Sequence, residues 1–226
     1  MPNPLVQWFP NVAARLPEFF DSFVQTLIMV AVSGVISFFF AVLFAVILTL
    51  TQRGGLAPNA VVFNILDKLV NLFRSIPFII LAAALVPVTR ALIGTSIGTK
   101  GAIFPLIVGI TPFFTRQIQS ALASIKPGFI EAAEAMGLTT TQIVFRIYLR
   151  EAVPQIIRVT VITLVSLVGL TAIVGMVGGG GLGDFAIRYG YQRYMLDATY
   201  ASIIVLVVLI GVIEFIGRLL VEITEH

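Results

Sequence analysis

The chain has 226 residues, of which 58% are hydrophobic and 11% are charged, and its formal net charge is +3. Soluble domains contain about 45–50% apolar and about 25% charged residues, so a soluble enzyme is close to excluded. The small positive charge predicts no nucleic-acid partner. The sequence has no Cys and a single His, the last residue, which argues against disulfides, thiolate nucleophiles, His-type metal sites and a Ser-His-Asp triad. We therefore expect an integral membrane protein that moves a solute.

Residues 1–22 are expected to form an amphipathic segment in the membrane interface. Apolar side chains recur there at helical spacing: Leu5, Trp8, Phe9, Val12, Leu16 and Phe19. Trp8 is the expected interfacial anchor. The segment lacks the basic start and short apolar run of a cleavable signal. Residues 23–226 are expected to form the transmembrane domain.

Five apolar runs are expected to cross the bilayer as helices, which predicts an all-α integral membrane fold. A crossing needs about 20 mostly apolar residues. The runs are 23–50, 75–89, 101–115, 159–183 and 198–213. The second, third and fifth are shorter than a full span, so their charged ends are expected to snorkel or to face protein and water.

Lys and Arg are divided unevenly between the two faces that five crossings create. One face would carry eight of them: Arg53, Lys68, Arg116, Lys126, Arg146, Arg150, Arg158 and Arg218. The other face would carry five: Arg15, Arg90, Lys100, Arg188 and Arg193. Because cytoplasmic loops are rich in Lys and Arg, we expect the N-terminus outside, and both the loop 124–154 and the C-terminus inside.

The loop 124–154 is too polar to cross the membrane, yet it is patterned as two short helices. Pro127 and Gly128 end the preceding helix. Residues 129–136 are expected to be helical, with Gly137 at the C′ position. Thr139 and Gln142 then predict a capping box, which starts a second helix that runs to about Val153 and is stopped by Pro154. The loop is therefore expected to be a bent helical hairpin.

Two interpretations of this hairpin are open: a solvated interfacial loop, or an element that docks into a partner's groove. Its small residues would let a groove approach the backbone closely, as in other helix-in-groove complexes. Glu131 and Glu134 add negative charge in the first turns, which suits the helix dipole and could also meet basic groups.

The hairpin resembles the EAA loop of permease subunits of ABC importers. That pattern is Glu-Ala-Ala, three residues, Gly, nine residues and Ile-x-Leu-Pro. The sequence matches it through Leu149, and Arg150 stands where the family has Pro. The resemblance implies that the coupling to an ATPase is made by these residues: Glu131, Ala132, Ala133, Glu134, Gly137, Ile147 and Leu149.

Two further segments extend the resemblance over nearly the whole chain. Residues 74–78, Arg-Ser-Ile-Pro-Phe, are similar to a segment of the amino-acid branch of these permeases. The glycine run 178–184 and residues 186–194 resemble the methionine importer permease family. The resemblance implies a homodimer of five-helix chains, two cytoplasmic ATPase subunits and an extracytoplasmic substrate-binding protein.

The same glycine run could be mistaken for a nucleotide motif. Gly178, Gly180 and Gly183 fit G-x-G-x-x-G, and Gly178 and Gly183 also fit the two glycines of G-x-x-x-x-G-K-[ST]. Asp184 and Phe185, however, stand where the second motif needs its phosphate-binding Lys and its Ser or Thr. The run also follows an apolar crossing rather than a strand. We expect no cofactor in this chain, and ATP and Mg²⁺ to be bound by the partner ATPase.

Five residues are expected to form a gate or to line the path of the substrate: Met176, Gly178, Gly179, Arg74 and Ser75. The glycines fit either a flexible turn that leaves the membrane or a close-packed constriction or hinge. Met176 fits either ordinary packing or a gate. For the membrane-proximal Arg74 a cavity-facing or partnered role is expected, whereas Arg116 is expected to snorkel at the cytoplasmic interface.

The sequence thus predicts a permease subunit, not itself an enzyme, of an ATP-driven importer of methionine or a close analogue, in a bacterial cytoplasmic membrane. The alternatives are a permease for another small solute and a secondary transporter that needs no ATPase. A secondary transporter usually shows intramembrane ionisable residues or internal repeats. The sequence shows no convincing internal repeat, and its two longest apolar runs carry no charged residue.

Overall fold

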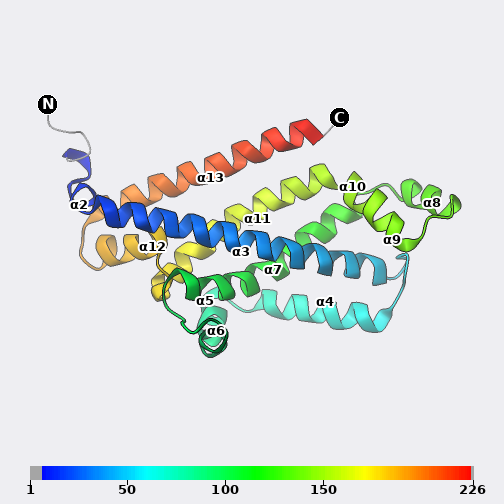
Figure 1. The fold of residues 1–226 in the computed structure, drawn as a ribbon, viewed down its shortest axis with the longest axis horizontal. Helices are drawn as coiled ribbons and strands as arrows, with labels where there is room; N and C mark the ends of the chain where they lie inside the picture. The colour runs from blue at the N-terminus through cyan, green and yellow to red at the C-terminus, as the bar shows by residue number, and fades with distance from the viewer. Residues whose placement is uncertain (1–6, 225–226) are drawn as a thin grey trace. The chain divides into compact units, whose positions relative to one another are not determined.

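The computed structural model describes residues 7–224, and this part of the chain consists of helices joined by short turns and loops, without a strand (Figure 1). In chain order the helices are α2 (Pro10–Ala13), α3 (Leu16–Thr51), α4 (Ala60–Ser75), α5 (Phe78–Ala84), α6 (Val86–Ile93), α7 (Gly98–Ala123), α8 (Pro127–Ala135), α9 (Thr140–Ile143), α10 (Leu149–Glu151), α11 (Val153–Val174), α12 (Gly181–Phe185) and α13 (Leu196–Thr224). Three π-helical turns interrupt them: η1 (Val144–Tyr148), η2 (Gly175–Gly179) and η3 (Ala186–Tyr191).

Among residues 7–224, four helices are long and apolar enough to cross a membrane: Leu16–Thr51, Gly98–Ala123, Val153–Gly179 and Leu196–Thr224. They correspond to the first, third, fourth and fifth expected crossings. The fourth ends earlier than expected, because the backbone leaves helical geometry at Val177 and Gly178, and Gly181 then begins α12.

The expected crossing 75–89 is not one continuous helix. Ser75 ends α4, Ile76 is extended, and α5 and α6 follow as helices of 7 and 8 residues. Pro77 precedes α5 and Pro87 lies in the first turn of α6. Because proline has no N–H and disfavours a helical residue before it, each of these prolines lies where a helix begins. The apolar composition of the run concealed these breaks.

The chain forms two compact units, each built from three separate stretches. Unit 1 consists of Met1–Val35, Pro77–Gly109 and Leu164–Ile213. Unit 2 consists of Ile36–Ile76, Ile110–Thr163 and Glu214–His226. The glycine turn lies in unit 1, and the hairpin lies in unit 2.

The start of the described chain is tied to unit 1 by specific contacts. The backbone N–H of Asn11 donates to Asp197 Oδ2 at 2.8 Å, and its side-chain amide donates to Oδ1 at 2.9 Å. Val12 is buried in a cluster with Phe185 and Tyr189, whereas Trp8 is 73% exposed. Leu5 lies outside the described residues. Helix α3 already begins at Leu16, so residues 16–22 belong to the first long helix; the interfacial location of the segment stays a prediction.

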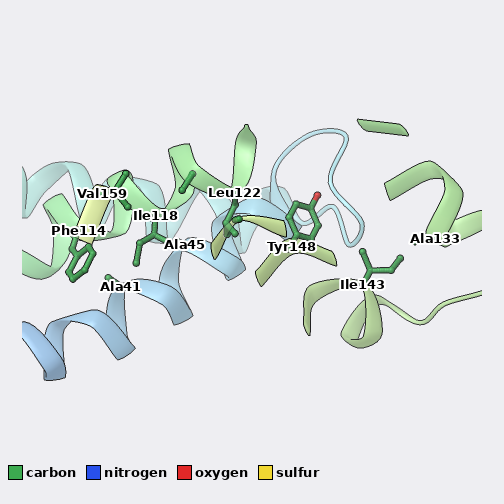
Figure 2. Close-up of a cluster of buried hydrophobic side chains, with 11 residues drawn as sticks. Ala41, Ala45, Phe114, Ile118, Leu122, Ala133, Ile143, Tyr148 and Val159 are labelled. Atoms are coloured by element: carbon green, nitrogen blue, oxygen red, sulfur yellow. The ribbon is translucent and has the colours of Figure 1, made fainter. Parts of the chain in front are cut away.

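The core of unit 2 joins the hairpin to the ends of two long helices (Figure 2). Ala41 and Ala45 of α3 and Phe114 and Ile118 of α7 form one part of this core. The hairpin contributes buried side chains to the same cluster: Ala133, Ile143, Tyr148 and Ala152. The hairpin is therefore a packed part of unit 2 and not a free loop.

Candidate functional site

The bend of the hairpin is fixed by two local motifs that the sequence predicted (Figure 1). At the end of α8, Gly137 has φ +76°. Its N–H donates to Glu134 O at 2.9 Å, and Leu138 N–H donates to Ala133 O at 3.1 Å. These are the two bonds of a Schellman motif. The predicted C′ position of Gly137 is confirmed.

The second motif starts α9. Gln142 N–H donates to Thr139 Oγ1 at 3.4 Å, and Thr139 N–H donates to Gln142 Oε1 at 2.9 Å, which completes the predicted capping box. The helical path continues through η1 and α10 to Glu151, and Pro154 then lies in the first turn of α11. The second helix therefore ends two residues before the expected position and contains a π-helical turn.

The predicted coupling residues divide between the two faces of the hairpin. Glu131, Ala132, Glu134 and Gly137 are exposed. Ala133 is fully buried, and Ile147 and Leu149 are half-buried against the core of unit 2. The hairpin thus presents an acidic, small-residue face to its surroundings and uses its apolar face as an anchor.

The anchored face is kept uncharged around Tyr148. Its side chain is 7% exposed. Burial raises the pKa of the Tyr148 phenol, and the nearby carboxylate of Glu134 raises this pKa further. A phenol at its ordinary pKa of about 10 is already neutral at physiological pH, and the raised pKa keeps Tyr148 neutral to more alkaline pH.

The glycine turn of unit 1 is closely packed. Its backbone has φ +90° at Gly178, +78° at Gly180 and +83° at Gly181. A Cβ on Gly180 would lie 2.5 Å from Gln25 Oε1, and one on Gly181 would lie 2.7 Å from the Met29 Cε. The turn is therefore packed and not loose at Gly180 and Gly181, and a role as a constriction or hinge of the path stays a prediction.

Side chains of α3 hold this turn from across the sequence. Gln25 Oε1 accepts a hydrogen bond from Gly181 N–H at 2.8 Å, and Thr26 Oγ1 accepts one from Leu182 N–H at 2.9 Å. These bonds satisfy N–H groups at the start of α12, as helix-capping side chains do. Sequence reasoning missed both residues, because a cap contributed by a distant helix leaves no local spacing signal.

The predicted gate residues lie directly before the capped turn. Met176 is 54% exposed and Val177 is 50% exposed, whereas Gly179 is buried. Gly178 has open space around its Cα and a left-handed backbone, so its glycine is required by conformation. Exposure of Met176 is compatible with a pathway role, which stays a prediction.

Arg74 and Ser75 lie in the last turn of α4, in unit 2. Ser75 Oγ donates to Leu72 O at 2.7 Å, so its hydroxyl closes the end of its own helix. Arg74 is exposed. Both residues therefore belong to a different unit from Met176, Gly178 and Gly179, and their pathway role also stays a prediction.

Three comparisons with known proteins bear on this arrangement. Residues 41–226 match the family described as "Binding-protein-dependent transport system inner membrane component". The chain belongs to this family. It is similar to the probable D-methionine transport system permease protein MetI of Vibrio cholerae, with 42% identity over 99% of this chain and 98% of that protein. It is also similar to the methionine import system permease protein MetP of Bacillus subtilis, with 36% identity over 97% of this chain and 98% of that protein.

The solved structures agree with the sequence relatives. A chain of the MetNI methionine ABC transporter, in an inward-facing conformation, matches with a TM-score of 0.90 and 38% identity, over 100% of both chains. This match confirms the predicted all-α permease fold. Membership of the family of inner membrane components confirms the prediction of a multi-pass transport subunit in the cytoplasmic membrane.

The polar contacts of Arg116 differ from those expected from the sequence. Arg116 of α7 was expected to snorkel. Instead its Nη2 donates to Asp67 Oδ1 at 2.5 Å and to Asn71 Oδ1 at 3.0 Å, both on α4, and its Nη1 donates to Gln119 Oε1 at 2.8 Å. Charged groups near a membrane are costly unless they are paired, and here α4 supplies the partner within unit 2. Asp67 and Asn71 are four residues apart, so one helix face carries both acceptors.

Proposed function

We propose that the chain is the membrane-spanning permease subunit of an ATP-driven importer that carries methionine or a close analogue into the cytoplasm. The printed names of its full-length relatives from Vibrio cholerae and Bacillus subtilis describe methionine transport, at 42% and 36% identity. The solved transporter that it resembles is a methionine ABC transporter, matched at 38% identity over the whole chain.

The observation that carries the mechanism is the division of the hairpin into an anchored face and an exposed face. Ala133 and Tyr148 pack into the core of unit 2, together with side chains of α3 and α7. Glu131, Ala132 and Glu134 are left exposed beside a bend that two hydrogen-bonded motifs hold in shape. A rigid element with one anchored face transmits a push to the helices behind it.

The proposed assembly contains two copies of this chain, two cytoplasmic ATPase subunits and an extracytoplasmic substrate-binding protein. A symmetric path between two copies follows the usual two-fold rule for homodimers. ATP and Mg²⁺ would be bound by the ATPase subunits, because the glycine run lacks the Lys and Ser or Thr of a phosphate-binding loop.

The proposed cycle follows from these parts. ATP binding draws the two ATPase subunits together, and their grooves carry the two hairpins inward. The attached long helices tilt, and the cavity opens toward the binding protein. Hydrolysis resets the cycle. Contacts with the substrate in the path need only be weak, because tight binding would slow release.

The orientation proposed is N-terminus outside and C-terminus inside, with the hairpin in the cytoplasm. The excess of Lys and Arg on the hairpin side supports it. In this orientation the glycine turn and Met176 lie toward the outer side, where a gate would receive substrate.

The experiment that tests this proposal measures methionine uptake into proteoliposomes. The proteoliposomes contain this chain assembled with its co-expressed ATPase, and the binding protein is supplied with them. We expect labelled methionine uptake that requires ATP, and we expect Glu131→Lys to abolish substrate-stimulated ATP hydrolysis while the dimer stays assembled. Lys126→Glu, which also reverses a charge next to α8, serves as a control and should retain most activity. Uptake driven by an ion gradient without an ATPase would instead establish the secondary transporter.

A further inference from the structure

A small cavity lies beside the glycine turn of unit 1. Its volume is about 120 Å³, and its walls come from α5, α6, the start of α7 and the π-helical turn η2, together with the residues next to them. Val177 and Gly179 of η2 belong to its lining, so the cavity adjoins the segment that contains Met176. All of its lining residues belong to unit 1.

The lining of this cavity is mostly apolar. It consists largely of alanine, valine, glycine and proline. Among the described residues that form it, Thr89 and Ser96 alone have polar side chains, and none has a charged one. Val86 and Val177, which also line the cavity, are 39% and 50% exposed, so a ligand can enter on the side that they form. Apolar walls with a few polar groups are typical of small-molecule sites.

The most informative group of the lining is the hydroxyl of Thr89. Thr89 is 1% exposed, and its Oγ1 has no hydrogen-bond partner among residues 7–224. Other buried threonines of this protein donate to the carbonyl four residues earlier, as Thr115 and Thr163 do at 2.8 and 2.7 Å. A buried hydroxyl that makes no hydrogen bond costs free energy. The Thr89 hydroxyl is therefore available as a donor to a group that enters the cavity.

We propose that this cavity binds the side chain of the transported amino acid, whose thioether sulfur accepts a hydrogen bond from the Thr89 hydroxyl. The inference rests on the proposed function, and it names the residues that recognise the substrate in the path. A thioether is a weak hydrogen-bond acceptor in a flexible, unbranched apolar chain, which matches apolar walls that carry one free donor. The ammonium and carboxylate groups of the amino acid stay outside the cavity, because the described lining offers them no charged partner.

Size and chemistry favour a thioether side chain over simpler occupants. An apolar cavity of about 150 Å³ in another protein binds benzene, so a cavity of about 120 Å³ has room for an unbranched side chain. Several waters would be needed to fill this volume, and each would need about two to four polar partners, whereas the lining has two hydroxyls. A hydrocarbon chain of a lipid would fill the space but leave the Thr89 hydroxyl unpaired.

The test is photo-cross-linking of the assembled, nucleotide-free transporter in detergent with the diazirine analogue of methionine, followed by peptide mapping. The binding protein is left out, so that labelling of this chain reports its own site. We expect labelled peptides from α6, the start of α7 or η2, and we expect methionine to protect them. Norleucine has a methylene group in place of the sulfur. It should protect several-fold more weakly, because it cannot accept the hydrogen bond from Thr89.

Two pairs of variants separate binding from a structural role. Thr89→Val should abolish the preference for methionine over norleucine. Thr49→Val removes another buried hydroxyl that has no partner among residues 7–224, and it should keep the preference; neither variant should lower the thermal midpoint. Ala83→Leu should extend into the cavity and reduce labelling and methionine uptake several-fold. Ala84→Leu, at the next exposed residue of α5, which does not line the cavity, should not.

Three results overturn the proposal: equal protection by methionine and norleucine in the unsubstituted chain, a preference that survives Thr89→Val, or labelling and uptake by Ala83→Leu that match those of Ala84→Leu. ATP-driven uptake by the complete transporter, with its binding protein, is measured in parallel. Any of these results together with normal methionine uptake overturns the cavity site alone. Absence of ATP-dependent methionine uptake from the unsubstituted transporter overturns the proposed function as well.

Discussion

Gln25 and Gly181 are 156 residues apart in the sequence, yet the side-chain oxygen of Gln25 accepts the backbone N–H of Gly181 at 2.8 Å. With the neighbouring bond from Leu182 to Thr26 at 2.9 Å, it attaches the glycine turn to the first long helix. Helix α3 therefore holds the glycine turn that follows Met176 by two hydrogen bonds. Any movement of this turn must either carry α3 with it or break these two bonds.

The packing of the turn predicts that Gly181→Ala destabilises the chain. The left-handed backbone at φ +83° costs a residue with a Cβ about 1–2 kcal/mol, and the new methyl would lie 2.8 Å from Thr26 Oγ1. Thermal unfolding in detergent should show a lower midpoint. Gly169→Ala is the matched control, because Gly169 has open space around it in α11, and it should not lower the midpoint. Equal midpoints for the two variants would contradict the packed turn.

The network on Arg116 predicts that Asp67→Ala lowers stability by about 1–2 kcal/mol, since a partly buried guanidinium loses its charged acceptor. Asp67→Asn keeps an acceptor and should cost less. Lys68→Ala, the exposed neighbour on α4, should have little effect. A double-mutant cycle of Asp67→Ala and Arg116→Ala gives the interaction free energy between the two side chains directly. If the Asp67 and Arg116 effects simply add, the pair does not stabilise unit 2.

The bend of the hairpin predicts a sharp difference between two substitutions at Gly137. Its φ of +76° tolerates Asn but not a β-branched residue, and no atom lies near enough to clash with a Cβ. Gly137→Asn should therefore keep substrate-stimulated ATP hydrolysis by the assembled transporter, and Gly137→Val should lose most of it. Comparable activity of both variants would mean that the angle of the bend is not needed for coupling.

The raised pKa of Tyr148 predicts a loss of stability at alkaline pH. Above the unperturbed pKa of about 10 the unfolded chain loses a phenol proton that the folded chain keeps. The unfolded state then binds fewer protons, so the free energy of unfolding falls as pH rises. Well below pH 10 both states keep this proton, so the phenol does not make the free energy of unfolding depend on pH. Denaturation between pH 8 and 11 should show a smaller decline for Tyr148→Phe than for the unsubstituted chain. Tyr191→Phe, at an exposed position, should behave like the unsubstituted chain.

The sequence predicted the hairpin well because its determinants are local. A glycine at C′ and a Thr–Gln capping box act within a few residues of the backbone that they shape, so Gly137 and Thr139 could be placed from spacing alone. The long helices could also be predicted, since apolar length is a property of composition. The family resemblance came from the same hairpin and from the glycine run.

Features that depend on distant contacts could not be predicted in this way. The caps from Gln25 and Thr26, and the acceptors of Arg116 on α4, join segments whose proximity only the folded chain creates. The break of the second expected crossing has a different cause. Residues 75–89 are apolar in composition, but Pro77 and Pro87 divide them into separate short helices, and composition does not register such breaks.

In the proposed transporter the exposed face of the hairpin engages a cytoplasmic ATPase subunit. The absence of Cys from the sequence makes it directly testable, because one introduced thiol is the only reactive thiol of the chain. The measurement is disulfide or short-linker cross-linking of Ala135→Cys in the assembled transporter, with Arg90→Cys as control. We expect Ala135→Cys to form a cross-link to the ATPase subunit that changes with nucleotide, and Arg90→Cys to form none. Labelling of Ala135→Cys by an impermeant reagent from outside the membrane, with no cross-link, would contradict it.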